Sequence, residues 1–153
     1  MSFEGDLKVG SIGERVAWDI LINLPDIRQV IDVRKDKRFQ AEDVDFLIET
    51  LERQFLKVEV KADRRMGETG NIIYETDTSG NIGCMTKTKA DLIYQYDTVN
   101  QIMYVIPTFF LRWFVAKRKL QEVRISGDTK GYLVSVEELK AQKIITKIYE
   151  VGK

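Results

Sequence analysis

Two neighbouring segments, residues 42–48 and 55–63, constrain the fold of this chain most strongly. Both alternate apolar with charged residues, which is typical of a β-strand with one apolar and one polar face. The polar faces carry Asp43 and Asp45 in the first segment, and Glu59, Lys61 and Asp63 in the second. The link between the segments is short, so we expect an antiparallel hairpin in which carboxylates from both strands and one ammonium group converge.

The rest of the pattern predicts an α/β fold. Apolar residues at helical spacing predict a first helix from Ser11 to Leu24, with Ser11 as its cap, and Pro25 ends it. A helix over 109–120 should pack against the sheet, with Trp113 in the core or at its rim. The remaining expected elements are strands at 30–33, 71–76 and 132–136, a hairpin formed by 92–96 and 102–106, a helical turn at 86–90 and a closing segment at 144–151. This order predicts one domain over 1–153, with a central mixed β-sheet flanked by helices.

The absence of one residue type narrows the chemistry. The chain contains no histidine, which excludes Ser-His-Asp and Cys-His catalysis and histidine-ligated zinc. The single cysteine, Cys84, cannot form an internal disulfide, and no glycine-rich nucleotide-binding loop occurs. Carboxylates and lysines must carry any catalysis, and hard oxygen ligands favour Mg²⁺, with Mn²⁺ as a substitute.

The acidic hairpin carries the groups that phosphodiester hydrolysis needs. Such a reaction requires charge neutralisation at the phosphoryl oxygens, an activated water and stabilisation of the leaving alkoxide. Asp45 and Glu59 are the expected Mg²⁺ ligands, helped by the carbonyl of Val60, and Lys61 is expected to orient the attacking water. Asp43 is the alternative to Asp45 as the first acidic metal ligand. Glu14 or Glu75 would lie near a second metal, and the number of metals stays open.

Charge is balanced overall and uneven locally. The chain has 24 basic and 24 acidic residues, which argues against a protein that coats polyanions. Basic and polar residues on either side of the acidic strands are the candidates for contacting phosphate. This set comprises Arg64, Arg65, Thr69, Asn71, Lys87, Thr88 and Lys89.

These residues resemble those of a known superfamily. A first helix with Gly13-Glu14-Arg15, then Asp45, then Val58-Glu59-Val60-Lys61 resembles the restriction-endonuclease-like PD-(D/E)xK nucleases, whose signature is Pro-Asp, a spacer and Asp/Glu-x-Lys. The helix is similar to that of archaeal Holliday-junction resolvases, and segments 69–75, 88–91 and 131–134 resemble small phage-encoded nucleases. No proline precedes Asp45, which leaves the identity of the first ligand open.

The resemblance implies a magnesium-dependent endonuclease that hydrolyses DNA, including branched or junction DNA, and works as a homodimer. It assigns Asp45 and Glu59 to metal binding, Lys61 to the water and Glu14 to an accessory role. The alternative is a non-catalytic nucleic-acid-binding or assembly domain with the same fold. No apolar run approaches the roughly 18 residues of a membrane helix, and the first residues do not form a signal peptide. We therefore expect a cytoplasmic protein without a membrane partner.

Overall fold

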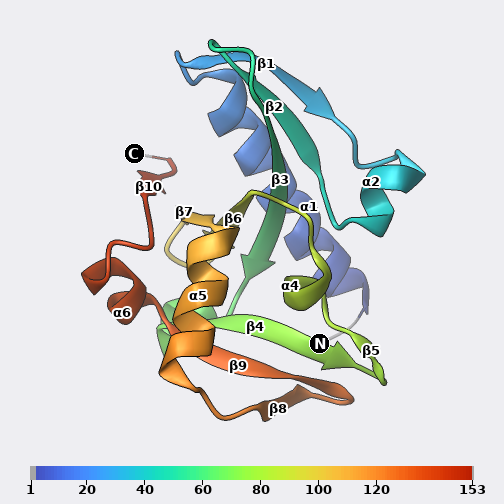
Figure 1. Cartoon of the computed structure of the whole chain (residues 1–153), viewed down its shortest axis with the longest axis vertical. Coiled ribbons are helices and arrows are strands. Elements are labelled where there is room, and N and C mark those ends of the chain that lie inside the picture. The colour runs from blue at the N-terminus through green and yellow to red at the C-terminus, as the bar shows by residue number, and fades with distance from the viewer. Residues whose placement is uncertain (1–2, 153) are drawn as a thin grey trace.

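The acid-bearing segments form the predicted antiparallel hairpin within a six-stranded sheet (Figure 1). The structure, a computed structural model, describes residues 3–152. The strand order is β1-β2-β3-β6-β7-β10. β3 and β6 run parallel, and the other neighbouring pairs of this sheet are antiparallel, so the sheet is mixed. Its strands are β1 (Ile27–Asp32), β2 (Phe46–Thr50), β3 (Phe55–Asp63), β6 (Leu92–Asp97), β7 (Ile102–Pro107) and β10 (Lys147–Glu150).

A second sheet was not expected from the sequence. Four antiparallel strands pair in the order β5-β4-β9-β8, separately from the central sheet. A Cβ on Gly131 of β9 would collide with the carbonyl oxygen of Tyr74 on β4, so the missing side chain permits this close pairing. The expectation of one sheet was therefore incomplete. The strands are β4 (Asn71–Thr78), β5 (Asn81–Ile82), β8 (Val123–Ser126) and β9 (Thr129–Ser135).

The first helix is longer than the sequence pattern indicates. It begins at Phe3, so Ser11 lies inside it and is not its cap. The first turns lack the apolar spacing of a buried face, and Leu7 is exposed. Gly13 lets the helix lie against β3, because a Cβ there would come within 2.8 Å of the Ala62 Cβ. The helices are α1 (Phe3–Ile22), α2 (Lys37–Ala41), α3 (Met66–Thr69), α4 (Cys84–Lys87), α5 (Thr108–Arg118) and α6 (Val136–Ala141).

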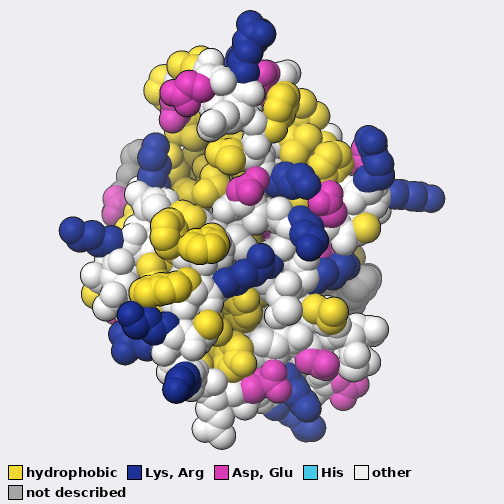
Figure 2. All heavy atoms as spheres, in the orientation of Figure 1, with side chains coloured by type: hydrophobic (Ala, Val, Ile, Leu, Met, Phe, Trp, Pro, Cys, Tyr) yellow, Lys and Arg dark blue, Asp and Glu magenta, His cyan; other side chains and the backbone are white. Residues whose placement is uncertain are grey.

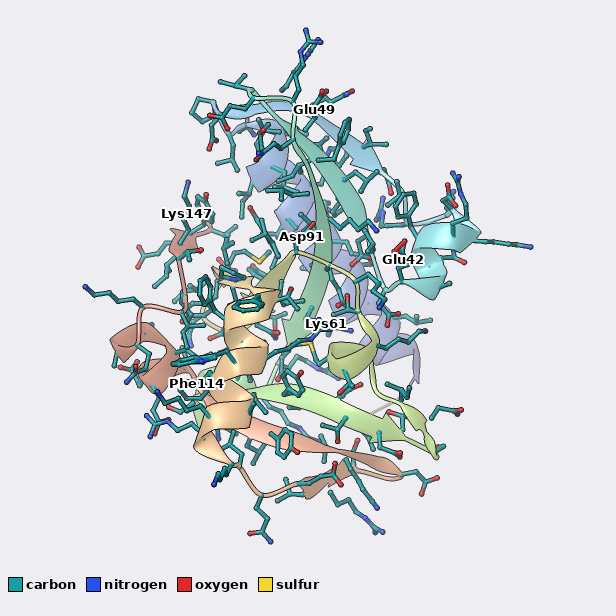
Figure 3. All side chains as sticks on the ribbon, viewed as in Figure 1. Glu42, Glu49, Lys61, Asp91, Phe114 and Lys147 are labelled. Carbon is teal, nitrogen blue, oxygen red and sulfur yellow. The ribbon has the colours of Figure 1, made fainter. Side chains whose placement is uncertain are left out.

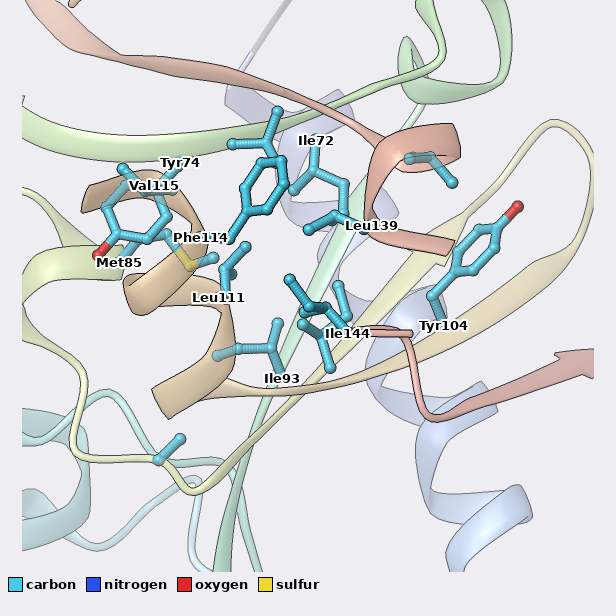
Figure 4. Packing of buried hydrophobic residues seen from close by; sticks show 14 of the residues in the cluster. Ile72, Tyr74, Met85, Ile93, Tyr104, Leu111, Phe114, Val115, Leu139 and Ile144 are labelled. Carbon is cyan, nitrogen blue, oxygen red and sulfur yellow. The ribbon is translucent and has the colours of Figure 1, made fainter. Parts of the chain in front are cut away.

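Two hydrophobic clusters cover opposite faces of the central sheet. On one face α1 packs on the apolar side of β2 and β3, with Ala17, Leu21 and Phe46 fully buried. On the other face α5, α6 and the second sheet share a core (Figure 4), in which Ile72 and Leu111 are fully buried. The expected arrangement of a central mixed sheet flanked by helices is confirmed. Within residues 3–152, no helix has the length and apolar character required to span a membrane.

Several local predictions are also confirmed. The segments at 92–96 and 102–106 form the β6–β7 hairpin, and the second acidic strand covers 55–63 as expected. Ser135 caps α6, because its Oγ accepts a hydrogen bond from the Glu138 amide at 3.2 Å. The first acidic strand begins later than predicted, at Phe46, so that Asp43 and Asp45 precede it.

Candidate functional site

The start of the β2–β3 hairpin brings Asp45 and Glu59 into one pocket. Phe46 lies opposite Val58, and Asp45 stands just before β2, outside the paired residues. Two hydrogen bonds fix Asp45: its amide donates to the Val58 carbonyl at 2.8 Å, and its Oδ2 accepts from the Val60 amide at 2.7 Å. The two carboxylates line the same pocket.

Glu59 is a buried acid with one satisfied oxygen. Its side chain is 4% exposed, and one oxygen, Oε1, lies 2.8 Å from Lys61 Nζ. The other, Oε2, is buried and has no hydrogen-bond partner among the described residues. Burial raises the pKa of Glu59, although Lys61 opposes this shift. A buried carboxylate oxygen without a partner is costly, and this oxygen is suited to a cation.

Asp45 is also held in an unfavourable environment for its charge. Burial is the main reason why the pKa of Asp45 is raised, and the nearby charge of Glu14 adds to the effect. Glu14 projects from α1 and accepts a hydrogen bond from Arg34 Nη1 at 3.0 Å. Arg34 is shared with Asp32, which it contacts at 2.7 Å. Glu14 therefore stands at the margin of the site, with its charge already paired.

Asp43 lines the same pocket from the loop before β2. Its backbone has a φ of 54°, a left-handed conformation that aspartate tolerates better than most residues. Its Oδ2 is buried without a hydrogen-bond partner in the described part of the chain, and Lys87 Nζ lies 3.9 Å away. The pocket thus brings Asp43 together with Asp45, Glu59, Lys61 and Glu14.

The oxygen atoms of Asp45, Glu59 and Val60 suit a cation that keeps part of its water shell. Among residues 3–152, no three or more Asp, Glu, Cys or His side chains form a group able to hold a metal. Two carboxylates and the Val60 carbonyl would leave the remaining positions to water, which suits Mg²⁺. The unpartnered Glu59 oxygen supports the same fit.

Lys61 joins the acidic pocket to a second cavity. Burial disfavours its charge, but the interactions with Glu59 and Cys84 together outweigh burial, so the pKa of Lys61 is raised. Lys61 also interacts with Cys84, whose Sγ donates to Glu75 Oε2 at 3.0 Å. Burial raises the pKa of Cys84 to about 12, so the thiol stays protonated at neutral pH. Glu75 belongs to this second cavity and not to the pocket of Asp45 and Glu59.

The residues expected to contact phosphate fall into two groups. Lys87 and Lys89 are exposed beside Asp43. Arg65, Thr69 and Asn71 line a cavity at the end of β3, together with Arg124. Arg64, next to Arg65, is half-buried. The two groups do not form one continuous strip.

The structure does not support the prediction that Thr88 contacts phosphate. It is 1% exposed, so its side chain does not reach a phosphate at the surface. Its Oγ1 donates to the Asp43 carbonyl at 3.0 Å and accepts from the Ala90 amide at 3.1 Å. Its observed contacts therefore position the acidic loop.

Arg112 holds the segment from Met85 to Thr88, and sequence reasoning did not single it out. From α5, its Nη2 lies 2.7 Å from the Thr88 carbonyl, 3.1 Å from that of Met85 and 3.3 Å from that of Thr86. These carbonyls lie at the end of α4, where backbone oxygens lack helical partners. A lone arginine on a helix carries no signal for such a contact.

We expect Arg112→Ala to loosen α4 and the segment up to Lys89. Loss of charge-assisted bonds to partly buried carbonyls should lower the free energy of unfolding by about 2 kcal/mol, measured by urea denaturation. Hydrogen exchange should accelerate at the amides of Thr88 and Lys89. Arg118→Ala is the matched control, since its contact with Glu138 is exposed and 3.6 Å long. Equal stability losses in the two variants would contradict this role of Arg112.

Comparison with known proteins identifies the fold. No protein-family description and no curated protein matches the sequence. Among solved structures, the chain is similar to that of a bacterial homing endonuclease, I-Ssp6803I. The match has a TM-score of 0.51 and 18% sequence identity, and it covers 90% of this chain and 82% of the other. At this identity the likeness concerns the fold: a mixed sheet with flanking helices, shared with an endonuclease.

Proposed function

We propose that this protein is a magnesium-dependent endonuclease that hydrolyses phosphodiester bonds in DNA. One observation carries the proposal: Asp45, Glu59 and Lys61 meet on one face of the β2–β3 hairpin, and a buried oxygen of Glu59 has no partner within residues 3–152. The endonuclease with a similar fold supports the same class of reaction. A structural role alone does not explain why a buried and a half-buried acid, both with raised pKa values, should face one pocket.

Each residue has a defined role in this proposal. Asp45 and Glu59 would hold Mg²⁺ together with the Val60 carbonyl, and Glu14, paired with Arg34, would stand at the edge of the site. A bound Mg²⁺ lowers the pKa of its water and neutralises charge on the phosphoryl group. Lys61, held by Glu59 at 2.8 Å, orients the attacking water. The hydrogen bond from the Val60 amide to Asp45 favours Asp45 over Asp43 as the first ligand.

DNA is positioned from both sides of the site. Lys87 and Lys89 approach the phosphates beside the acids, and Arg64, Arg65, Thr69 and Asn71 act at the end of β3. Ion pairing with phosphates gives affinity without sequence preference. Branched or junction DNA is included among the substrates, and Mn²⁺ is expected to replace Mg²⁺.

A non-catalytic DNA-binding or assembly domain is the second candidate. The formal net charge of zero favours it, because many nucleic-acid-binding proteins are strongly basic. The two candidates differ in one measurable property, the cleavage of DNA.

We expect the protein to cut at least one member of a labelled panel of duplex, single-stranded and four-way-junction DNA when Mg²⁺ is present. Glu59→Gln should reduce cleavage about 1,000-fold, because it removes a charged ligand of the metal. DNA retention, measured in Ca²⁺ by gel shift, should be unchanged. Glu52→Gln, at an exposed turn, is the control and should cut normally. No cleavage with Mg²⁺ or Mn²⁺ would favour the non-catalytic domain, and full activity in Glu59→Gln would remove Glu59 from the site.

A further inference from the structure

Helix α5 exposes three large aromatic side chains. Phe109 is 75% exposed, Phe110 50% and Trp113 46%. The core, one of the two places expected for Trp113, is ruled out, because the buried positions of α5 are Thr108, Leu111, Phe114 and Val115. Figure 2 shows hydrophobic side chains at the surface over α5. Exposed apolar clusters of this kind mark interaction surfaces.

A hollow beside Trp113 carries two cations. It has a volume of about 330 Å³, within the range of ligand sites, and its lining includes Trp113, Lys117 and Arg118. The Lys117 Nζ lies 4.7 Å from the centre of the Trp113 ring, so a cation accompanies this ring. Gln142, which follows α6, adds an amide that can donate and accept hydrogen bonds. The hollow therefore offers an aromatic surface, positive charge and a polar group side by side.

The α5 face is positively charged. We use this name for the three exposed aromatic residues and the two cations beside them, Phe109, Phe110, Trp113, Lys117 and Arg118. The helix contains no acidic residue, and a further cation, Lys119, follows it. Arg118 lies 3.6 Å from Glu138, but both side chains are almost half exposed, so this ion pair is weak. The charge of the α5 face therefore favours an anionic partner.

Exposed lysines connect the α5 face with the acidic pocket. Arg112 of α5 donates to the Thr88 carbonyl at 2.7 Å, and the Lys89 amide donates to the Glu42 carbonyl at 2.9 Å. The segment after α4 is thus held between α5 and the acidic loop before β2. Its Lys87 and Lys89 side chains are exposed. Figure 2 shows Lys and Arg side chains on this side of the molecule, next to the hydrophobic side chains over α5.

Two acids lie along this path, and both are engaged by one residue of β3. The Asp91 Oδ2 accepts a hydrogen bond from the Lys57 amide at 2.8 Å, and the Glu42 Oε2 lies 2.8 Å from the Lys57 Nζ. Figure 3 shows Asp91 by the start of α5 and Glu42 beside α2. With Lys57, Lys87 and Lys89 against these two carboxylates, the path to the pocket stays basic.

We propose that the α5 face binds an unpaired strand of DNA, with its bases stacked on the aromatic rings and its phosphates beside Lys117 and Arg118. Proteins that hold single strands without sequence preference combine aromatic side chains for the bases with cations for the backbone. The α5 face has both, and the hollow beside Trp113 accommodates one nucleotide. A continuous duplex keeps its bases stacked on one another, so they cannot reach these rings.

The size of the α5 face favours a nucleic-acid strand over a protein partner. Its three rings together expose roughly 300 Å², because they are about half exposed and a whole aromatic side chain buries about 150–250 Å². A stable protein interface needs about 800 Å² from each partner. The large aliphatic residues of the helix, Leu111 and Val115, are buried and add nothing to this area. One stacked base, however, raises affinity roughly 5- to 150-fold, so three rings suffice for a short strand.

The site also narrows the class of substrate, and this step rests on the proposed nuclease activity. A strand that leaves the α5 face past Lys89 and Lys87 reaches the acidic loop. DNA with an unpaired strand beside the cleaved bond, such as a fork, a flap or a single strand, should therefore be cut in preference to a continuous duplex. Trp113→Ala should remove this preference and leave duplex cleavage unchanged.

Binding should be measured by fluorescence anisotropy in EDTA, which prevents metal-dependent cleavage. The probe is a labelled deoxythymidine strand of about 12 nucleotides, compared with an abasic strand of the same length. Trp113→Ala should weaken binding of the deoxythymidine strand at least about 5-fold, whereas Trp113→Phe keeps a ring and should retain most of the affinity. The abasic strand has the same phosphates without bases, so Trp113→Ala should not change its weaker binding. Phe55→Ala, at a 55% exposed aromatic position where β3 begins, is the control and should bind like the wild type.

A second experiment detects stacking on Trp113 directly. The chain has two tryptophans, so in Trp18→Phe the indole emission comes from Trp113 alone. The deoxythymidine strand should quench this emission, and the abasic strand should not. A purely structural role of Trp113 would give no such difference between the two strands.

Three results would overturn the proposal. One is equal affinity of the wild type and Trp113→Ala for the deoxythymidine strand, and another is emission that the strand leaves unchanged. The third is a wild-type dimer, seen by sedimentation, that Trp113→Ala dissociates without loss of strand binding, because a second copy would then occupy the α5 face.

The failure of this proposal can be told apart from the failure of the nuclease proposal. Glu59→Gln should bind the deoxythymidine strand in EDTA as tightly as the wild type does, because the α5 face lies outside the acidic pocket. Strand binding through Trp113 without any cleavage would reject the nuclease activity and leave the α5 face in place. Cleavage by a protein whose strand binding ignores Trp113 would do the reverse.

Discussion

Asp45→Asn should abolish cleavage and yet stabilise the metal-free protein. The substitution removes a charged metal ligand, and we expect cleavage to fall about 1,000-fold. The asparagine Oδ1 can still accept the hydrogen bond from the Val60 amide that now reaches Asp45. It no longer carries a charge that burial and Glu14 disfavour. We expect the free energy of unfolding at pH 7.5 in EDTA to rise, because the charge that burial disfavours has been removed.

The pH dependence follows from the direction of the shift. Below the ordinary carboxyl pKa, Asp45 is protonated in both the folded and the unfolded chain and costs nothing. As pH rises, the unfolded chain releases the proton first, so stability falls until the raised pKa of the folded protein is passed. Urea unfolding at pH 4.5 and 7.5 should therefore show a smaller loss in Asp45→Asn than in the wild type.

Without Mg²⁺, Asp45→Asn should be more stable than the wild type. With Mg²⁺, the wild type should be the more stable of the two, because Mg²⁺ binds the ionised acid. Asp19→Asn, at an exposed position on α1, is the control and should change stability by less than about 0.5 kcal/mol. If Asp45→Asn and wild type lost stability equally between the two pH values, the raised pKa of Asp45 would be refuted.

Lys61→Met should be the most destabilising of the site variants. The ammonium group is the partner of Glu59 Oε1, and its loss leaves a buried acid without a counter-charge. Removal of one member of a buried ion pair typically costs about 3–5 kcal/mol, and protonation of Glu59 will limit the loss at low pH. Cleavage should fall at least about 100-fold. Mg²⁺ binding should persist, because the carboxylates remain.

Lys57→Met is the matched control for this experiment. Lys57 lies on the same strand, and its Nζ is 2.8 Å from Glu42, but the Glu42 side chain is 31% exposed, whereas that of Glu59 is 4% exposed. A partly exposed pair contributes about 1 kcal/mol or less, so the control should lose little stability and retain activity. Unchanged turnover in Lys61→Met would exclude this residue from the mechanism, whatever its effect on stability.

Among the predicted elements, the β2–β3 hairpin is the one that the sequence predicted most accurately. Residues 56–63 alternate strictly, and β3 spans residues 55–63. Alternation places Glu59 and Lys61 on one face of β3, and the structure shows that they line one pocket with Asp45, which precedes β2. These are local properties of two adjacent strands, which is why a period of two residues could reveal them. Their catalytic roles stay predictions.

The sequence pattern did not reveal features that depend on contacts between residues far apart in the chain. The second sheet joins β4 to β9, which are far apart in the chain, and the close approach at Gly131 has no local signature. Arg112 reaches backbone carbonyls around Thr88 from another helix. Burial of Thr88 likewise results from the packing of the loop that contains it. Helical spacing did not reveal the exposed side of α5, because both sides of that helix carry aromatic residues.

The parallel pairing of β3 with β6 has a consequence for the order in which the chain folds. Parallel neighbours need a crossover, and here the crossover contains β4, β5 and α4, so two central strands cannot pair before a long loop has closed. β4 is then completed by β9, which is synthesised later still. Such long-range pairing slows folding. The pocket around Lys61 therefore takes its final form late, and a nascent chain ending before β9 should be inactive.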